Sequence, residues 1–271
     1  MSFLPPLTPL PEFDAPPVNE TALAVDFEPI AQWGVPHFGL FWKRIRAEFP
    51  RFQVHPPLPR TRDLTGEPRA LAPGVQFEIV TQPPIRCWFM TAELERLIQV
   101  QNDKFVSNWR RMAGGATYPR YAQLRPAFEQ AWGEFMGFLA EENLPAPAVN
   151  QCEVSSTNHF ERGVEWESFG DLARITELWR NAGLPALLKS PDTGSFTVRF
   201  PVAGGYLHVA LNPAIRFADS REILQMTLVA RLRVDQSQDL LDRLDRGREL
   251  VVRGFAALTT AEMHKIWKRR Q

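Results

Sequence analysis

The densest pattern of hydrophobic and polar residues lies between positions 97 and 160. Two short runs, at 97–101 and 105–109, are rich in aliphatic and aromatic residues and flank an Asn-Asp dipeptide. Asn and Asp tolerate the left-handed backbone of a tight turn, so the pattern predicts a β-hairpin. Because side chains alternate along a strand, Trp109 is expected on one face and Asn108 on the other.

A 3.6-residue apolar period follows the hairpin and predicts a helix from about 121 to 142. The apolar stripe consists of Leu124, Phe128, Trp132, Phe135 and Leu139. Pro126 fits this helix if it lies in the first turn, where its missing backbone N–H is not needed. After Pro145 and Pro147, residues 150–160 return as a predicted strand.

The rest of the chain shows shorter patterns of the same two kinds. Strands are predicted at 21–27, 75–80, 85–90, 195–202, 206–211 and 224–234, and helices at 35–49, 172–179 and 241–258. The proline- and charge-rich stretch from 52 to 73 is expected to be an extended crossing and a loop. The capping-box sequence Thr259-x-x-Glu262 predicts the start of a last short helix.

These elements predict an α+β fold in which antiparallel sheets pack against long amphipathic helices. Six prolines before position 18 predict an extended N-terminal arm over residues 1–17. Residues 18–160 form one expected α+β unit, and residues 161–271 form a second unit packed on it. Each half runs through a strand or helix, several antiparallel strands and a long helix. This order indicates either two similar units or one sheet built from two halves.

Composition and charge argue against several functional classes. With 271 residues, 44% of them hydrophobic, the chain can bury a sizeable core. Its 31 basic and 31 acidic residues give a formal net charge of zero, which provides no general attraction to nucleic acid or to an anionic membrane. The apolar runs are too short to cross a bilayer. We therefore expect neither nucleic-acid binding nor membrane insertion.

The N-terminal sequence and the cysteines indicate a reducing compartment. The first residues carry no basic region before an apolar core, so they do not read as a secretory signal. Cys87 and Cys152 lie far apart and in no metal-binding spacing. Cys152 is expected to be a small core residue instead of a reactive thiolate. We expect a cytoplasmic protein with reduced thiols and no metal site.

Familiar catalytic motifs are absent from the sequence. The chain contains no Gly-rich phosphate loop, GxSxG elbow, HExxH or paired CxxC motif, which favours a protein without a cofactor or catalysis. One polar cluster keeps an enzymatic alternative open, because His159 could act as the base for Ser155 or Ser156, beside Asn158, in a hydrolase or transferase. The competing interpretation is a polar strand end whose side chains are satisfied by hydrogen bonds.

A second polar cluster favours binding. Asn108, Trp109 and Arg110 are consecutive, and Tyr118 and Arg120 follow shortly afterwards. Arginines beside aromatic rings bind phosphate or carboxylate groups through paired hydrogen bonds. This cluster is therefore the candidate ligand-binding site. The competing interpretation is a strand end with solvated charges and one core tryptophan.

Several segments resemble a known sequence family in register. They are PPVNETALAVDFEPI, HFGLFWKRIRAEFP, LIQVQNDKFVSNWRR, YPRYAQLRPAFEQAWGEF and VNQCEVSSTNHF. Together they resemble a sporadically distributed bacterial family of unknown function, over residues 16–160 and, in outline, over the C-terminal half. The resemblance implies no particular activity, cofactor or catalytic residue. The patchy distribution of the family implies an accessory role in a mobile or defence-type system.

Taken together, the sequence favours a cytoplasmic binding module without catalysis. Its ligand is expected to be a small anionic molecule or a partner protein, held at the cluster between positions 108 and 120. The load of eight tryptophans and nineteen phenylalanines is also compatible with a homo-oligomer.

Overall fold

The computed structural model describes residues 9–60, 84–115, 117–180, 187, 191–216, 218–235 and 239–270. Within them, nine antiparallel strands form one sheet: β1 (Val18–Phe27), β2 (Arg51–His55), β3 (Arg86–Met90), β4 (Arg96–Gln101), β5 (Lys104–Arg110), β6 (Val149–Glu161), β7 (Phe196–Val202), β8 (Gly205–Arg216) and β9 (Arg221–Arg233). The helices are α1 (Val35–Ile45), α2 (Tyr121–Glu141), α3 (Leu172–Ile175), α4 (Leu240–Leu258) and α5 (Ala261–Ile266), with a 3-10 turn, η1 (Phe169–Asp171). The predicted α+β class with antiparallel strands is confirmed.

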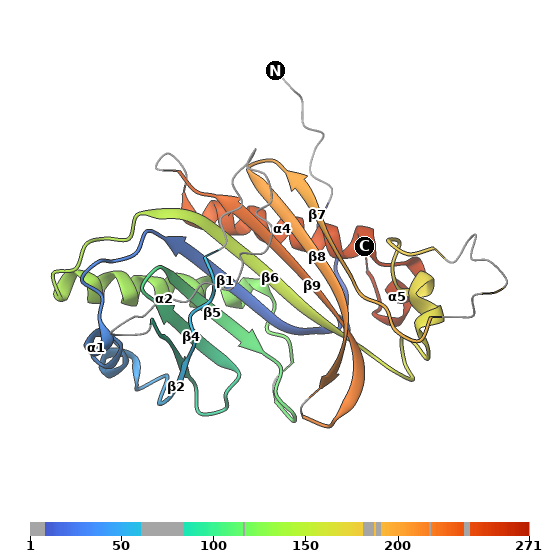
Figure 1. Cartoon of the computed structure of the whole chain (residues 1–271), viewed down its shortest axis with the longest axis horizontal. Coiled ribbons are helices and arrows are strands. Elements are labelled where there is room, and N and C mark those ends of the chain that lie inside the picture. The colour runs from blue at the N-terminus through green and yellow to red at the C-terminus, as the bar shows by residue number, and fades with distance from the viewer. Residues whose placement is uncertain are drawn as a thin grey trace, which may run out of the picture.

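The strands follow the order β2-β3-β4-β5-β1-β6-β9-β8-β7 across the sheet. β1 and β6 are neighbours at its centre, and their antiparallel register runs from the pair Val18–Asn158 to the pair Phe27–Val149. β1 also pairs with β5, and β6 pairs with β9. Strands from both predicted units therefore share one sheet, and β2 and β7 are its two edges (Figure 1).

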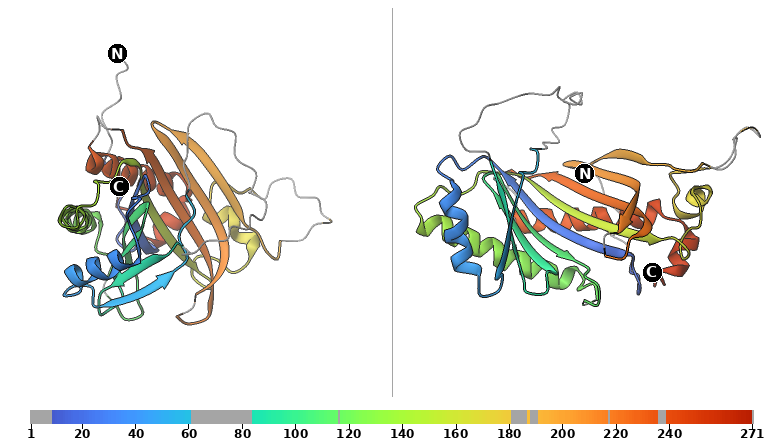
Figure 2. Two further views of the ribbon diagram at one scale, coloured as in Figure 1. Left: turned by 60° about the vertical axis from the view of Figure 1, so that its left-hand side comes forward. Right: turned by 60° about the horizontal axis from the view of Figure 1, so that its bottom comes forward.

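Three helices lie on one face of this sheet. α4 contacts β6, β8 and β9, α2 contacts β5, and α1 packs against α2. The two views of Figure 2 place these helices on the same side of the strands. As predicted from the alternation, Phe105 and Trp109 of β5 face the helices, and Asn108 and Arg110 face away. We refer to these two sides as the helix-covered face and the opposite face.

The predicted apolar stripe of α2 lies at the centre of the core. Phe128 and Phe135 are fully buried, and the Phe105 ring of β5 lies 5.2 Å from the Phe135 ring and 6.2 Å from the Phe128 ring. Burial of a large apolar side chain contributes about 1.5–3 kcal/mol to the free energy of folding. This cluster therefore fixes α2 on the sheet and positions the first turn of the helix.

Helix α4 packs close to the sheet because it contains a glycine. A Cβ atom at Gly247 would lie 2.9 Å from Cγ2 of Val154 in β6, closer than real Cβ atoms approach. The missing side chain allows Leu244, Val251 and Phe255, which share one side of the helix, to reach the core. The position of α4 over β6 and β9 thus depends on a small residue at this contact.

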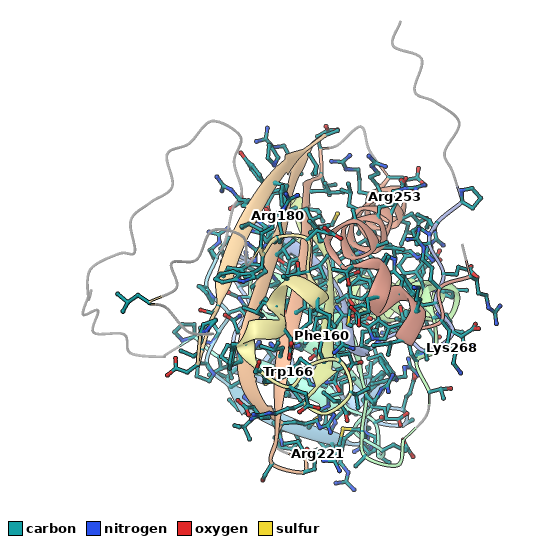
Figure 3. All side chains as sticks on the ribbon, turned by 90° about the vertical axis from the view of Figure 1, so that its right-hand side faces the viewer. Phe160, Trp166, Arg180, Arg221, Arg253 and Lys268 are labelled. Atoms are coloured by element: carbon teal, nitrogen blue, oxygen red, sulfur yellow. The ribbon has the colours of Figure 1, made fainter. Side chains whose placement is uncertain are left out.

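The C-terminal residues close one end of the sheet. Figure 3 shows Phe160 and Trp166 within the molecule and Lys268 at its surface. The Trp267 ring stacks on the Phe160 ring at 5.2 Å, and the Trp166 indole N–H donates to the Phe160 carbonyl at 3.0 Å. The backbone N–H of Asp14 donates to the Lys268 carbonyl at 3.1 Å. The described part of the N-terminal arm is therefore docked on this end of the chain.

Two predictions about helix positions are wrong. Pro126 lies inside α2, beyond the first turn, and its missing N–H leaves the Ala122 carbonyl without the usual donor one turn later. The packing of the apolar stripe outweighs that lost hydrogen bond. The last helix has Thr260 instead of Thr259 as its N-cap, because the Thr260 hydroxyl accepts from the Met263 N–H.

Other elements differ in extent from the prediction. The helix expected at 35–49 ends at Ile45, and the helix expected at 172–179 is the short α3. The stretch expected to be an extended crossing contains β2, because pairing with β3 supplies hydrogen bonds that its composition does not reveal. The strand predicted at 75–80 lies outside the described residues.

Candidate functional site

A cavity of about 340 Å³ lies on the helix-covered face, where the start of α2 approaches α4. β1 and β6 form its floor, α4 forms one wall, and residues 118–122 form another. Residues 11–18 of the N-terminal arm and Arg270 complete the lining. Segments that are far apart in the sequence therefore meet at the centre of the sheet.

The floor of the cavity is polar although it is buried. Thr21 of β1 lies opposite Ser156 of β6 in the strand register, and Asn158 follows on the same face. Asn158 is 1% exposed, and its Nδ2 donates to the Met226 carbonyl at 3.2 Å. Thr21 is 5% exposed, and its hydroxyl has no hydrogen bond of normal geometry. An unpaired buried hydroxyl is unfavourable, so Thr21 offers a free polar contact to a molecule in the cavity.

The walls of the cavity are largely apolar. Val251 and Phe255 of α4 and Val154 of β6 line it, and all three side chains are buried. Phe13 of the arm packs on Phe255 with the ring centroids 5.7 Å apart, and it lines the cavity as well. This part of the cavity suits the apolar body of a ligand.

Three arginines and two acidic residues also line the cavity. Arg270 forms an ion pair with Asp14, and Arg120 Nη2 donates to the Phe13 carbonyl at 2.8 Å. Arg248 lies over the Tyr121 ring at 5.0 Å. Within the described residues, its guanidinium has no hydrogen bond and no ion pair. Arg248 is thus a partly buried cation without a counter-ion.

Two tyrosines lie between these arginines. Burial raises the pKa of Tyr118, although the neighbouring Thr21 hydroxyl and then the charges of Arg248 and Arg120 act in the opposite direction. Burial also raises the pKa of Tyr121, and its hydroxyl donates to Oδ1 of Asp245 at 2.6 Å. Both phenols are therefore protonated at neutral pH, and Tyr118 is available as a hydrogen-bond donor.

The backbone at Arg120 is strained. This residue is the N-cap of α2 and has φ 64° and ψ 158°, close to a region that essentially only glycine adopts. Such a conformation costs about 1–3 kcal/mol and persists where surrounding contacts enforce it. Here the side chain is held by the Phe13 carbonyl and lies over the Tyr118 ring at 5.6 Å. The strain occurs at the rim of the cavity, where the arm meets α2.

The ligand-binding residues predicted from the sequence are divided between the two faces of the sheet. Tyr118 and Arg120 line the cavity, and the Trp109 ring, 2% exposed, lies 5.4 Å from the Tyr118 ring. Asn108 and Arg110 lie on the opposite face. Asn108 bonds to side chains of β4 and β1, and Arg110 Nε donates to a backbone carbonyl of the β3–β4 turn.

The residues of the enzymatic alternative are also divided. Ser155, Ser156 and Asn158 line the cavity, and His159 does not. Strand alternation turns the side chains of Ser156 and Asn158 toward it, and those of Ser155 and His159 toward the opposite face. Ser155 and His159 are four residues apart along a straight strand, a distance of about 13 Å. Burial lowers the pKa of His159, and its Nδ1 has no partner. The described geometry brings no histidine base to either serine.

The sequence patterns do not single out Thr21 and Arg248, which both line the cavity. The segment around Arg248 resembles a solvated, charge-alternating helix face. However, Arg248 lies four residues after Leu244 and three before Val251, within the apolar stripe of α4. An arginine within an apolar helical stripe is unusual, and this feature of the sequence could have identified Arg248 as a residue that faces the sheet.

Other reactive groups offer little chemistry in the described residues. Cys87 and Cys152 are free and buried, and burial raises the pKa of their thiols to about 11 and about 12. The described part of the chain contains no cluster of three His, Cys, Asp or Glu side chains suited to a metal ion. None of the helices in this part is long and apolar enough to span a membrane.

Comparison with known proteins gives no family assignment. No protein-family model matches the chain, and no curated protein matches it. A functional proposal for this chain therefore rests on the geometry and charge of the cavity.

Proposed function

We propose that the chain is a binding module that holds a small amphipathic anion in this cavity without catalysing a reaction on it. The observation that carries the proposal is the guanidinium of Arg248, which lines the cavity without an acceptor from the described residues. The unpaired Thr21 hydroxyl lies on the floor of the same cavity.

Charge supports an anion as the ligand. Among the lining residues, Asp14 pairs with Arg270, whereas Arg248 has no acidic partner. A partly buried cation without a counter-ion is unfavourable, and a carboxylate or phosphate would form charge-assisted hydrogen bonds with it. The protonated phenol of Tyr118 is a further donor for the same group.

Size and polarity support a ligand with an apolar body. A volume of about 340 Å³ falls within the range of small-molecule sites. Val251 and Phe255 of α4 and Val154 of β6 offer apolar contacts within the same cavity. The ligand class is thus an anion, either a carboxylate or a phosphate, attached to a compact aromatic or aliphatic group.

The proposal of binding without catalysis is supported by the groups at the cavity. Ser156 and Asn158 are hydrogen-bonding groups there, and none of the described histidines lines the cavity. Glu12 and Asp14 lie on the arm, and Asp14 is engaged by Arg270. These residues can hold and orient a ligand, and they form no nucleophile–base pair.

Native mass spectrometry of the purified protein, followed by titration calorimetry, tests the proposal. We expect a retained small molecule in the native spectrum. We also expect 2-naphthoate to bind with a dissociation constant in roughly the micromolar range, and 2-naphthol, which has the same rings without the carboxylate, to bind about tenfold more weakly.

Two substitutions on α4 give the matched comparison. Arg248→Gln should weaken 2-naphthoate binding at least about tenfold, because a hydrogen bond to a charged group contributes about 1.5–3 kcal/mol, and should leave 2-naphthol binding unchanged. Arg246→Gln is the control, because Arg246 pairs with Glu249 away from the cavity. The proposal would be contradicted if the protein retained no small molecule and also did not bind 2-naphthoate. It would also be contradicted if Arg248→Gln and Arg246→Gln changed 2-naphthoate binding equally.

We also propose that the two halves of the chain are structurally related. The boundary differs from the expected one at position 160, because β6 belongs to the second half. With halves 18–141 and 149–258, the first strand of each pairs with the last, β1 with β5 and β6 with β9, and a helix follows the last strand. The central β1–β6 pair would then lie on the axis that relates the halves, next to the cavity. Superposition of residues 18–141 on residues 149–258 tests this, because equivalent strands must coincide in the same order.

A further inference from the structure

The outer edge of β2 has no strand partner in the described part of the chain. β2 is the end of the sheet, paired on one side with β3. Four of its five residues are exposed. An edge strand presents unpaired backbone N–H and C=O groups, which form hydrogen bonds with another extended chain.

Two large apolar side chains lie along this edge. Phe52 and Val54 are each 56% exposed, and both lie on the helix-covered face, opposite Phe89 and Cys87 of β3. The Trp42 ring of α1 lies 5.2 Å from the Phe52 ring, so the apolar surface continues from the strand onto the helix. A partner for this edge must therefore be a strand that supplies apolar residues at alternate positions.

The other edge of the sheet is protected against such pairing. β7 contains Pro201, which has no N–H to donate to a further strand. Its apolar residues are partly buried, and its exposed positions are polar or proline. β2 contains neither proline nor lysine. Within the described residues the sheet thus offers one open edge, and this favours a closed dimer over an open filament.

We propose that β2 pairs antiparallel with β2 of a second copy of this chain, with a two-fold axis at Gln53. This register places Phe52 opposite Val54 of the second copy on one face, and Arg51 opposite His55 of the second copy on the other. Aromatic side chains opposite β-branched ones stabilise antiparallel pairs. The strand is therefore complementary to itself.

The polar side of this pairing is free of like-charge repulsion at neutral pH. Burial, and then the charge of Arg86, lower the pKa of His55, so its imidazole is neutral at about pH 7. Its ring lies against the Trp88 ring with centroids 4.0 Å apart. Arg51 of one copy therefore meets a neutral imidazole of the other. Because β2 is short, the contact is small and the dimer is expected to be of modest affinity.

Sedimentation equilibrium of the full chain measures this dimer. The wild-type protein is expected to dimerise with a dissociation constant in roughly the micromolar range. Phe52→Lys and Val54→Lys should each raise that constant at least about tenfold, since lysine on an edge opposes strand pairing. Val164→Lys and Ile215→Lys are controls, because these residues are 55% and 58% exposed away from β2. The proposal would be overturned if the protein stayed monomeric up to a concentration about a hundred times the expected dissociation constant. A dimer whose dissociation constant is unchanged by Phe52→Lys would overturn it as well.

Disulfide trapping tests the register independently. A two-fold axis at Gln53 brings the two Gln53 Cβ atoms to about 4.5–5.5 Å, so Gln53→Cys should form a covalent dimer on mild oxidation. The native Cys87 and Cys152 are buried and do not compete. Thr197→Cys, at an exposed position of β7, is the control and should stay monomeric. Equal crosslinking at both positions, or none at Gln53→Cys, would contradict the β2 dimer.

Discussion

The two faces of the sheet contain polar groups of similar kinds and satisfy them differently. On the opposite face, Lys104 is 6% exposed and contacts Asp26 at 3.1 Å and Glu153 at 3.9 Å. On the helix-covered face, Thr21 and Arg248 line a cavity, and neither has a hydrogen bond of normal geometry from the described residues. The Lys104 group therefore completes its contacts within the protein. Buried polar atoms without a partner occur on both faces, since Arg86 Nε, Trp88 Nε1 and His159 Nδ1 are unpaired on the opposite face, but of these atoms only the Thr21 hydroxyl borders the cavity.

This difference separates structural polar groups from candidate functional ones. On the opposite face, Arg86 donates to Gln99, Gln99 donates to Asn108, and Asn108 donates to Glu20. Burial raises the pKa of Glu20, and its bond to Asn108 opposes that rise. Such a chain of contacts holds strands in register. Polar groups left unpaired beside a cavity instead indicate a ligand that completes them.

The largest expected effect comes from breaking the ion pairs of the opposite face. Lys104→Met should lower the free energy of unfolding by about 3 kcal/mol at about pH 7, because Asp26 and Glu153 lose their shared cation. Burial raises the pKa of both carboxyls, leaving that of Asp26 above its usual value, and the charge of Lys104 opposes this rise at both, so both pKa values are higher in the variant. The loss should therefore shrink as the pH falls through the raised pKa values and the carboxyls become protonated.

Urea unfolding at about pH 7 and about pH 4 measures this effect. The exposed Lys43→Met in α1 is the control and should change the unfolding free energy by less than about 0.5 kcal/mol. A destabilisation by Lys104→Met that is equal at both pH values would indicate that packing, and not charge, is lost.

A smaller effect is expected from the strained backbone at the cavity rim. Arg120→Gly should be more stable than Arg120→Ala by about 1–2 kcal/mol, because only glycine adopts φ 64° and ψ 158° without strain. Both variants lose the guanidinium, so the comparison isolates the backbone. Arg46, the C-cap of α1, has an ordinary helical φ of −62° and serves as the control. There Arg46→Ala should be more stable than Arg46→Gly by about 0.5–1 kcal/mol, because glycine loses more backbone freedom on folding. Thermal or urea unfolding of the four variants decides the matter.

The smallest expected effect on the free energy of unfolding comes from removing the unpaired Thr21 hydroxyl, compared with removing the paired hydroxyl of Thr259. Thr21→Val removes a buried hydroxyl without a hydrogen bond and should stabilise the protein by about 1 kcal/mol. Thr259→Val removes a buried hydroxyl that donates to the Phe255 carbonyl at 2.7 Å, and should destabilise it by about 1 kcal/mol. Destabilisation by both substitutions would show that the Thr21 hydroxyl is paired in solution.

Much of the fold follows from local patterns in the sequence. The hairpin of β4 and β5, the apolar stripe of α2 and the long strand β9 lie where periodicity predicts them. β2 was missed because a five-residue edge strand with two apolar residues has too weak a period to stand out from a proline-rich stretch. α3 was predicted too long because four apolar positions fit one helical stripe, although only Leu172–Ile175 is helical.

The candidate site could be predicted only in part. The sequence identified Tyr118, Arg120 and Asn158 as polar residues of interest, and all three line the cavity. Arg110 was grouped with Tyr118 and Arg120 because the three are near in sequence, although strand alternation sends its side chain to the opposite face. Adjacent residues on a strand point apart, so nearness in sequence is a poor guide to a site built on a sheet.

The sequence by itself determined the α+β class, the main strands and helices, and which side chains share a face, because these depend on contacts within a few residues along the chain. The tertiary structure alone decided the pairing of β1 with β6, the docking of the arm at Phe13, and the meeting of Thr21 with Arg248 at one cavity. Those contacts join residues more than a hundred positions apart, and no local period encodes them.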